Sequence, residues 1–273
     1  GGGPMNEPRL GAAMDIRFGA TVEEFMAYVT DLGLDHVEFK REYLAGHPNT
    51  PDPERVGELA EEYGVTLSYH APFRDWNTGS YDETVRQNSV ERVKRTIDDA
   101  AAAGATSVVV HGGSVPHRYP DWVRRRARES ARRSLAECAE YAQLVGVSLC
   151  LENQPIDDDK RRYTTSPADL AAMIEEVDVP PQYLGVTLDV GHASVNGHDY
   201  REFVEEFGHR IRVCHLHDND GTADQHEPLT AYESIVESVP ANFFIFEMKS
   251  LEDLATSLGA DVAPPEPEVS ADD

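Results

Sequence analysis

Histidine and acidic residues close a series of short apolar runs in this sequence. Six runs end in a side chain that can bind a metal ion: His70, His111, Glu152, Asp189, His215 and Glu247. Three more such side chains follow two of these runs: His192 in LDVGHAS, and Asp224 and His226 in ADQHEP. Imidazole and carboxylate ligands without a thiolate suit Zn, Mn, Co or Fe. If the chain folds so that these runs meet, the nine residues predict a site for divalent metal ions.

The apolar runs alternate with amphipathic stretches eight times along the chain. Strands are predicted over 15–19, 35–39, 65–70, 106–111, 147–152, 183–189, 210–217 and 242–247. Helices are predicted near 21–32, 52–63, 82–103, 120–145, 166–177, 199–207, 229–238 and 249–258. Eight βα units match the ~250 residues of a (β/α)8 TIM barrel. The sequence contains neither a GxGxxG string nor a P-loop, so it lacks the glycine-rich turn that would favour a doubly wound sheet. We therefore expect an α/β chain with a single TIM-barrel domain over 14–258, an N-terminal extension or cloning remnant over 1–13, and an acidic disordered tail over 259–273.

The alternation of side chains along each strand decides which of them face the inside of the barrel. In 147–152 the valine and the leucines share one face, whereas the serine, the cysteine and Glu152 share the other. The large apolar face has to meet the helices, so the small or polar face points inward. The strands that end in His70 and Asp189 repeat this pattern. All six tips should therefore gather at the C-terminal rim, where the active sites of TIM barrels lie.

Other polar residues lie close to these tips. His217 has the same parity as His215, but we prefer His215 as the ligand because it lies one step deeper. Glu38 at the tip of the second strand and Lys249 just past the eighth could reach a substrate, or they could be surface charges. Arg74, in the loop after the third strand, is a further candidate for substrate binding.

The charge balance restricts the partners and the environment. Asp and Glu total 50 against 24 Lys and Arg, a net charge of -26, and only four of the basic residues are Lys. Such a surface suits a salt-rich cytosol, where screening removes self-repulsion, so we expect a halophilic source and a cytoplasmic protein.

The charge opposes nucleic-acid binding. No apolar stretch reaches the roughly 18–20 residues of a membrane span. Six arginines in 120–145 predict a solvated face or a contact in a homo-oligomer, with a patch for an anionic ligand as the alternative. Three cysteines in apolar runs predict buried, reduced thiols.

The order of these motifs resembles the xylose isomerase-like TIM-barrel superfamily, which includes sugar isomerases, ketose 3-epimerases, inosose dehydratases and endonuclease IV. The matching strings are HAPFRDWN (70–77), VVVHGG (108–113), LENQP (151–155), LDVGHAS (188–194), CHLHDN (214–219), D-x-H (224–226) and FEMK (246–249). The resemblance covers roughly residues 14–258 and implies a TIM barrel with a metal-dependent site.

Two activities of that superfamily imply different uses of the same residues. In the ketose 3-epimerase pattern one metal ion is held by Glu152, Asp189, His215 and Glu247, and His192 contacts substrate. In the endonuclease IV pattern there are three zinc ions, held by His70, His111 and Glu152, by Glu152, Asp189, His215 and Glu247, and by His192, Asp224 and His226. The resemblance thus implies one to three divalent ions per chain, Zn or Mn.

We expect a metal-dependent sugar or sugar-phosphate isomerase or epimerase, which moves a proton through an ene-diolate with Glu152 and Glu247 as catalytic carboxylates. The alternative is an endonuclease IV-like AP endonuclease or phosphodiesterase, for which all nine ligand positions are filled. Nucleic acid is a partner only in that alternative, and the net charge opposes it. Phe73 and Arg74 also stand where the DNA enzymes carry an aromatic–aliphatic wedge. A dehydratase, or a binding-only barrel with a structural metal, are further alternatives.

Overall fold

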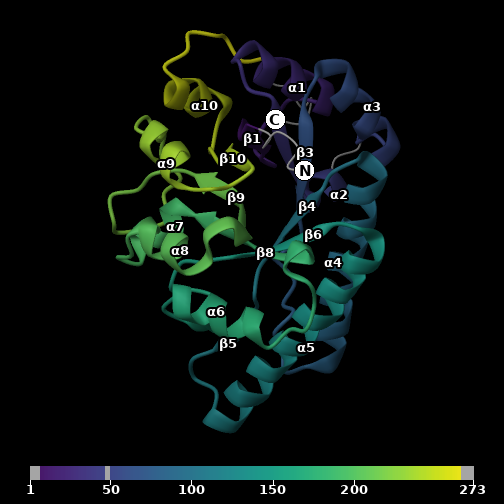
Figure 1. Ribbon diagram of the computed structural model, residues 1–273, viewed down its shortest axis with the longest axis vertical. Helices are drawn as coiled ribbons and strands as arrows, with labels where there is room; N and C mark the ends of the chain where they lie inside the picture. Colours follow the sequence, from purple (N-terminus) through teal and green to yellow (C-terminus); the bar gives the residue numbers. More distant parts are fainter. Residues whose placement is uncertain (1–6, 47–49, 266–273) are drawn as a thin grey trace, which may run out of the picture.

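The computed structural model describes residues 7–46 and 50–265, and its parallel strands close into a barrel (Figure 1). The strands pair in the order β1 (Arg9–Met14), β10 (Phe243–Phe246), β9 (Ile211–Leu216), β8 (Leu184–Asp189), β6 (Ser148–Glu152), β4 (Ser107–Val110), β3 (Thr66–His70) and β2 (His36–Lys40). Two short strands outside the barrel, β5 (Ser114–Pro116) and β7 (Lys160–Arg162), pair with each other in antiparallel fashion. The predicted single-domain (β/α)8 TIM barrel is confirmed.

Helices cover the outside of the barrel (Figure 1). Those that fall within the predicted ranges are α1 (Val22–Asp31), α3 (Pro53–Tyr63), α4 (Glu83–Ala103), α5 (Asp121–Val145), α6 (Pro167–Glu175), α8 (Tyr200–Phe207), α9 (Glu233–Ser238) and α10 (Leu251–Leu258). Two short helices that the sequence did not indicate, α2 (Arg41–Gly46) and α7 (Val190–Val195), follow directly after β2 and β8. Thr21 and Glu24 form a capping box at α1, which fixes where that helix begins.

The first strand lies earlier in the chain than the predicted 15–19. Because β1 covers Arg9–Met14, residues 9–13 belong to the barrel and not to an N-terminal extension; residues 1–6 lie outside the described ranges. A Cβ on Gly11 would lie 2.1 Å from the carbonyl oxygen of His36 on the neighbouring strand, so a glycine fits there. Asp15 instead forms a turn, since its Oδ1 accepts a hydrogen bond from the backbone N–H of Arg17 at 2.9 Å.

The first part of the acidic tail expected over 259–273 packs on the barrel. Val262 is partly buried against the core, and its carbonyl accepts a hydrogen bond from the hydroxyl of Tyr28 at 3.4 Å. The chain up to Val262 is therefore part of the folded domain. Residues 266–273, the rest of the expected tail, lie outside the described residues.

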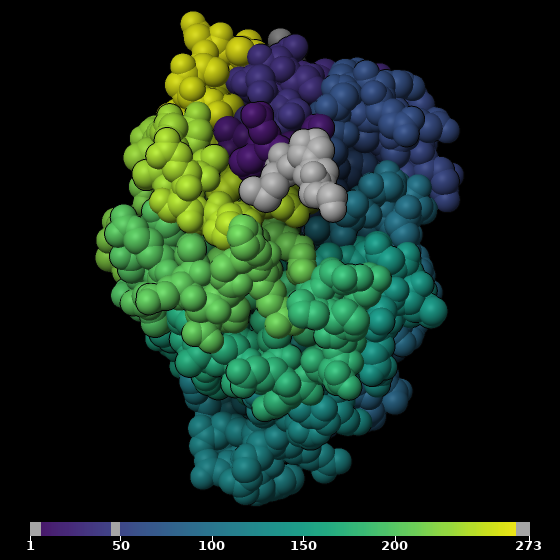
Figure 2. Space-filling model, viewed as in Figure 1, coloured from purple at the N-terminus to yellow at the C-terminus, as the bar shows by residue number. Residues whose placement is uncertain are grey.

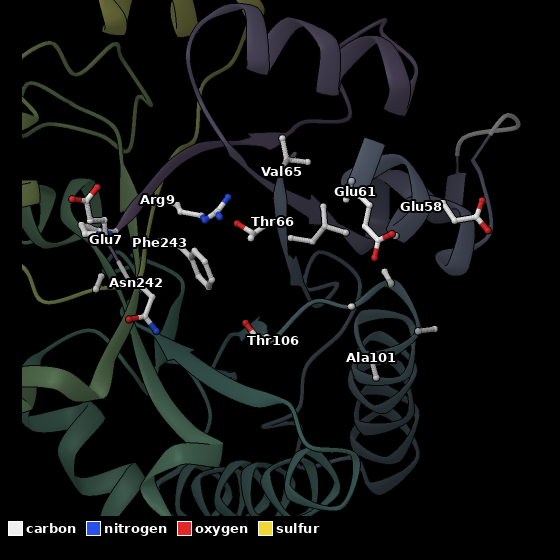
Figure 3. Close-up of a pocket in the computed structure, with 18 of the residues that line it drawn as sticks. Glu7, Arg9, Glu58, Glu61, Val65, Thr66, Ala101, Thr106, Asn242 and Phe243 are labelled. Atoms are coloured by element: carbon white, nitrogen blue, oxygen red, sulfur yellow. The ribbon is translucent and has the colours of Figure 1, made fainter. Parts of the chain in front are cut away.

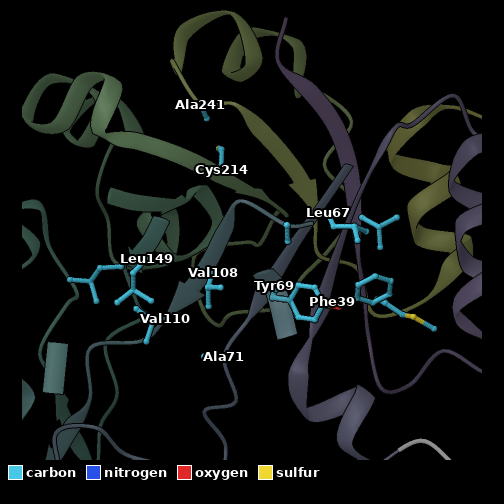
Figure 4. Packing of buried hydrophobic residues seen from close by; sticks show 14 of the residues in the cluster. Phe39, Leu67, Tyr69, Ala71, Val108, Val110, Leu149, Cys214 and Ala241 are labelled. Atoms are coloured by element: carbon cyan, nitrogen blue, oxygen red, sulfur yellow. The ribbon is translucent and has the colours of Figure 1, made fainter. Parts of the chain in front are cut away.

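Large apolar side chains fill the space between the barrel and its helices. Figure 4 shows part of this outer core, including Phe39, Leu67 and Tyr69. A second, smaller buried group fills part of the inside of the barrel: Ala13, Val109, Cys150, Val213 and Ile245. The predicted parity is thus confirmed on β6, where Cys150 belongs to the inner group and its leucine neighbours to the outer core. The three cysteines are free and buried, as predicted.

A cavity of about 1000 Å³ opens where the strands begin, at the N-terminal end of the barrel (Figure 3). Thr66 and Phe243 from the strands line it, together with Glu61 of α3 and Ala101 of α4. None of the nine predicted metal ligands lines this cavity. It therefore lies apart from the site that the sequence predicts.

The region that contains α5, coloured teal, forms the lower end of the molecule in Figures 1 and 2. Its predicted arginine face is largely paired with acids: Arg128 lies 3.2 Å from Glu176, and Arg133 lies 3.2 Å from Glu83. In the described part of the chain, no helix combines the length and apolarity that crossing a membrane requires.

Candidate metal centre

The nine predicted ligands come together where the barrel strands end. Together with His217, they form three groups, in each of which one ligand atom per residue lies within 4.8 Å of the others: His70, His111 and Glu152; Glu152, Asp189, His215 and Glu247; and His192, His217, Asp224 and His226. We refer to them as groups one, two and three. Glu152 belongs to both of the first two groups. His70, Glu152 and Asp189 are the last residues of their strands, as the parity argument requires.

Group one converges on a single carboxylate oxygen. Nε2 of His111 lies 2.8 Å, and Nε2 of His70 3.4 Å, from Oε1 of Glu152. Nδ1 of His70 donates a hydrogen bond to the carbonyl of Ala71 at 2.7 Å, which leaves Nε2 to face the site. Burial lowers the pKa of His111, and the interaction with Glu152 only partly offsets this effect. A neutral imidazole of this kind is the form that binds a metal.

Group two crowds one ring nitrogen with carboxylates. Nδ1 of His215 lies 3.0 Å from Oε2 of Glu152, 3.0 Å from Oε1 of Glu247 and 3.8 Å from Oδ2 of Asp189. Burial by itself lowers the pKa of His215, but the surrounding carboxylates, Glu247 first, raise it well above 6.5. One ring proton cannot satisfy three buried carboxylates. A divalent cation in their midst would compensate their charge, so the donor set fits a metal ion.

Group three is built around Asp224. Nε2 of His192 and Nε2 of His226 lie 3.1 and 3.2 Å from the same atom, Oδ2 of Asp224. Although burial opposes protonation of His192, the charge of Asp189 and the hydrogen bond to Asp224 raise its pKa to about 10. His226 has a φ of 51°, and among the described residues it is the only non-glycine with positive φ. Such a conformation has a cost that the surroundings must offset, and it is frequent at functional sites.

Several buried polar atoms at these groups have no hydrogen-bond partner among the described residues. They are Oδ2 of Asp189, Oδ1 of Asp224 and both ring nitrogens of His217. Each unsatisfied buried polar group reduces the stability of the fold by about 1–3 kcal/mol, so a cluster of them indicates a site for a bound ligand. A cation bound between the groups would supply the missing partner. His217 thus joins the site beside His215, rather than replacing it.

A cavity of about 330 Å³ opens above these groups. Glu152, Glu247, Phe73 and Arg74 are among the residues that line it. Arg74 thus lines the same cavity as the two carboxylates, and its role in substrate binding stays a prediction. The loop that carries it is held by Glu42, whose carboxylate accepts a hydrogen bond from the backbone N–H of Arg74 at 2.7 Å.

The two other candidate substrate residues do not line this cavity. Glu38 is fully buried beneath it, where its Oε2 accepts a hydrogen bond from Nε2 of His215 at 2.7 Å. Lys249 lies outside and pairs with Glu227 at 3.1 Å. Their geometry therefore argues against direct contact with a substrate.

Lys40 lines the cavity, and the sequence reasoning missed it. Its Nζ lies 3.1 Å from Oε2 of Glu247 and 3.9 Å from Oδ2 of Asp15. Burial opposes the charge of Lys40, but Glu247 and Asp15 raise its pKa. Strand parity could have identified Lys40, because it shares the parity of Glu38 and is the last residue of β2.

Comparison with known structures agrees with this architecture. A solved structure described as a D-tagatose 3-epimerase-like protein superposes with a TM-score of 0.76 and is 26% identical, covering 91% of this chain and 94% of that one.

Sequence relatives point in more than one direction. An uncharacterised protein of Methanocaldococcus jannaschii is 32% identical over 171 residues, which are 62% of this chain and 57% of that protein. A fructoselysine 3-epimerase of Shigella flexneri is 23% identical over 75% of this chain and 74% of its own length. A probable endonuclease 4 of Thermoplasma acidophilum is 27% identical over 69% of this chain and 65% of its own length.

The family comparison covers most of the chain. Residues 26–256 match the model of the xylose isomerase-like TIM barrel family. This range runs from α1 to α10 and contains all three groups that could hold a metal ion. The chain belongs to the xylose isomerase-like TIM barrel family.

Proposed function

We propose that the chain is a metal-dependent isomerase or epimerase of a sugar or sugar phosphate. The observation that carries this proposal is the position of two carboxylates around one nitrogen. Glu152 and Glu247 each lie 3.0 Å from Nδ1 of His215, and both line the cavity above group two. A reaction that removes a proton from carbon and returns it on another face or another carbon needs two such groups.

When a divalent ion is bound at group two, it supplies the positive charge that polarises a substrate carbonyl and its neighbouring hydroxyl. Glu152 would remove the proton from the carbon between them, which leaves an ene-diolate. For the isomer, Glu152 would return the proton that it removed to the neighbouring carbon. For the epimer, the ammonium of Lys40, 3.1 Å from Oε2 of Glu247, would pass a proton through Glu247 to the opposite face. Glu152 would then release its proton to water, and Lys40 would take one up from water, before the next turnover.

The relatives support this chemistry. One relative is named as a fructoselysine 3-epimerase and one similar structure as a D-tagatose 3-epimerase-like protein, and both names denote epimerisation at carbon 3. The cavity of about 330 Å³ is in the range of small-molecule sites. It is walled on one side by Phe73, whose ring centroid lies 4.4 Å from that of His111.

A phosphodiesterase acting on abasic DNA is the second candidate. Group three favours it, because one metal ion at group two would suffice for proton transfer and further ions would not be needed. The probable endonuclease 4 of Thermoplasma acidophilum is a relative as well. The net charge of -26 opposes it, since contacts with DNA phosphates rely on a basic surface.

The decisive experiment measures proton exchange. The metal-loaded protein, in molar KCl, is incubated with ketoses and ketose phosphates in D2O, and deuterium incorporation at carbon is followed by NMR; nicking of an abasic duplex is measured in parallel. Glu152→Gln should abolish exchange, whereas the matched control Glu227→Gln, at an exposed ion pair, should keep it. Nicking without exchange would replace our proposal with the alternative. Full activity in a folded Glu152→Gln protein would refute the role of that carboxylate.

A further inference from the structure

Group three contains one imidazole more than the sequence reasoning assigned to it. His192, Asp224 and His226 would leave one position of a tetrahedral ion open. The fourth member, His217, also presents a ring nitrogen within 4.8 Å of the ligand atoms of the other three. Whether this residue binds the ion decides what the centre can do, because catalytic zinc keeps an open position and structural zinc does not.

The other two histidines are oriented for binding. Nδ1 of His192 donates a hydrogen bond to the carbonyl of Asn153 at 2.8 Å, and Nδ1 of His226 donates to the carbonyl of Glu247 at 3.0 Å. Each proton is thus held on Nδ1, and each Nε2 faces Asp224. Backbone partners of this kind fix the tautomer and the ring orientation of a metal-binding histidine.

The ring of His217 is held in place by packing, without a hydrogen bond to any other residue that the structure describes. Its ring stacks on that of His226 with centroids 3.8 Å apart and planes 7° apart. Nε2 lies 2.7 Å from Oδ1 of Asp189, yet without the geometry of a hydrogen bond, and both ring nitrogens lack a partner among the described residues. The side chain is fully buried.

The backbone beside His217 leaves room for this ring. A Cβ on Gly191 would lie 2.1 Å from Cε1 and 2.2 Å from Nδ1 of His217. Any residue other than glycine at this position would displace the imidazole from the group. A buried, unpartnered ring in a space shaped for it indicates a ligand that completes its bonding.

We propose that His217 is the fourth protein ligand of a closed metal centre with His192, Asp224 and His226. Three imidazoles and one carboxylate are a donor set that zinc accepts in tetrahedral geometry. With all four positions filled by the protein, this centre activates no water. It ties the segment that carries Asp224 and His226 to α7 and β9 at the rim of the barrel. The inference concerns the metal site alone, and it does not depend on the identity of the substrate.

The test compares metal retention in matched variants. Wild type, His217→Asn and His209→Asn are loaded with zinc, dialysed against a graded series of a competing chelator and analysed for zinc per chain. His209 is exposed at the other end of the barrel and serves as the control. We expect His217→Asn to lose one zinc equivalent at chelator concentrations at least tenfold lower than wild type and His209→Asn. Equal retention in all three proteins would overturn the proposal.

A second measurement covers the case in which His217→Asn does not fold. Wild-type protein is loaded with Co²⁺, and its visible spectrum is recorded with and without azide. Separately, crystals of the zinc-loaded protein are measured by anomalous scattering at the zinc edge, which locates each zinc ion. A closed centre predicts that the cobalt bands of group three do not change with azide. A band shift at that centre, or an ion at group three without a His217 nitrogen within about 2.3 Å, would refute the fourth ligand. If His217→Asn loses zinc and the wild-type protein shows no proton exchange on any sugar, the proposed function is refuted, whereas the role of His217 as a ligand is supported.

Discussion

Oε2 of Glu38 accepts a hydrogen bond from Nε2 of His215 at 2.7 Å, in the buried interior of the barrel beneath group two. The same carboxylate accepts a second hydrogen bond, from the hydroxyl of Ser68 at 2.9 Å. With its proton held on Nε2, His215 presents Nδ1 to the acids of group two. Glu38 is therefore a positioning residue for a metal ligand and not a contact for the substrate.

This relationship predicts that Glu38→Gln weakens metal binding. An amide keeps the shape of the side chain but lacks the charge that makes His215 a better ligand, so the affinity of the tightest site should fall about 10- to 100-fold. The measurement is competition with a chromophoric chelator. Thr187→Val is the control, because Thr187 is also fully buried and its hydroxyl donates only to the carbonyl of Cys150. If the two variants bind metal equally well, Glu38 does not position His215.

His36 continues the same buried chain and predicts a dependence of stability on pH. Its Nε2 lies 2.9 Å from Oγ of Ser68, and burial lowers its pKa from 6.5 to about 3. Between these values the unfolded chain binds a proton that the folded chain does not. The contribution of neutral His36 is therefore complete above about pH 6.5 and is lost as the pH falls towards 3, by up to about 1.4 kcal/mol per pH unit.

His36→Gln should remove this part of the slope. The free energy of unfolding is measured in urea from pH 4 to 6.5 for wild type, His36→Gln and the exposed control His209→Gln. We expect a shallower slope in His36→Gln only. A slope that stays the same in that variant would assign the acid sensitivity to other groups.

The net charge of -26 predicts that stability requires salt. Carboxylates on the surface repel one another, and at molar salt the screening length falls to about 3 Å. The melting temperature should therefore rise substantially between low salt and molar KCl, as measured by circular dichroism. Sucrose at matched osmolality is the control for general exclusion effects, and a flat salt profile would contradict the halophilic interpretation.

Strand parity made most of the site predictable from the sequence. Because side chains alternate along a strand, Glu152 and Asp189 at the ends of apolar strands had to face the same rim. Residues 15–19 looked like a strand because they contain apolar residues, whereas the centre of β1 consists of the small residues Gly11, Ala12 and Ala13, which fit close backbone packing at Gly11. Patterns of hydrophobicity do not detect a strand selected for small size.

The remaining differences come from contacts between segments distant in sequence. The sequence pattern predicts which side chains of β2 face inward. It does not predict that Glu38 lies below the cavity and Lys40 beside it. Likewise, strand parity alone left His215 and His217 as alternatives for one metal-ligand position. In the structure they belong to different groups, because the bridge between Asp218 and Glu227 brings the segment with Asp224 back beside His217. Such long-range placement follows from packing and is invisible to local spacing.

Lys40 and Lys249 form a matched pair that tests this placement. Lys40 is 14% exposed, lines the cavity and lies 3.1 Å from Glu247, whereas Lys249 is 40% exposed and pairs with Glu227. Removing the charge of Lys40 leaves the buried Glu247 without its partner, so under the proposed mechanism Lys40→Met should lower kcat for proton exchange at least about tenfold, while Lys249→Met changes it less than about twofold. Both variants are measured at saturating substrate and full metal occupancy, so that a loss of metal is not mistaken for a loss of proton transfer. A large loss in Lys249→Met with normal turnover in Lys40→Met would reverse the assignment and return Lys249 to the substrate site.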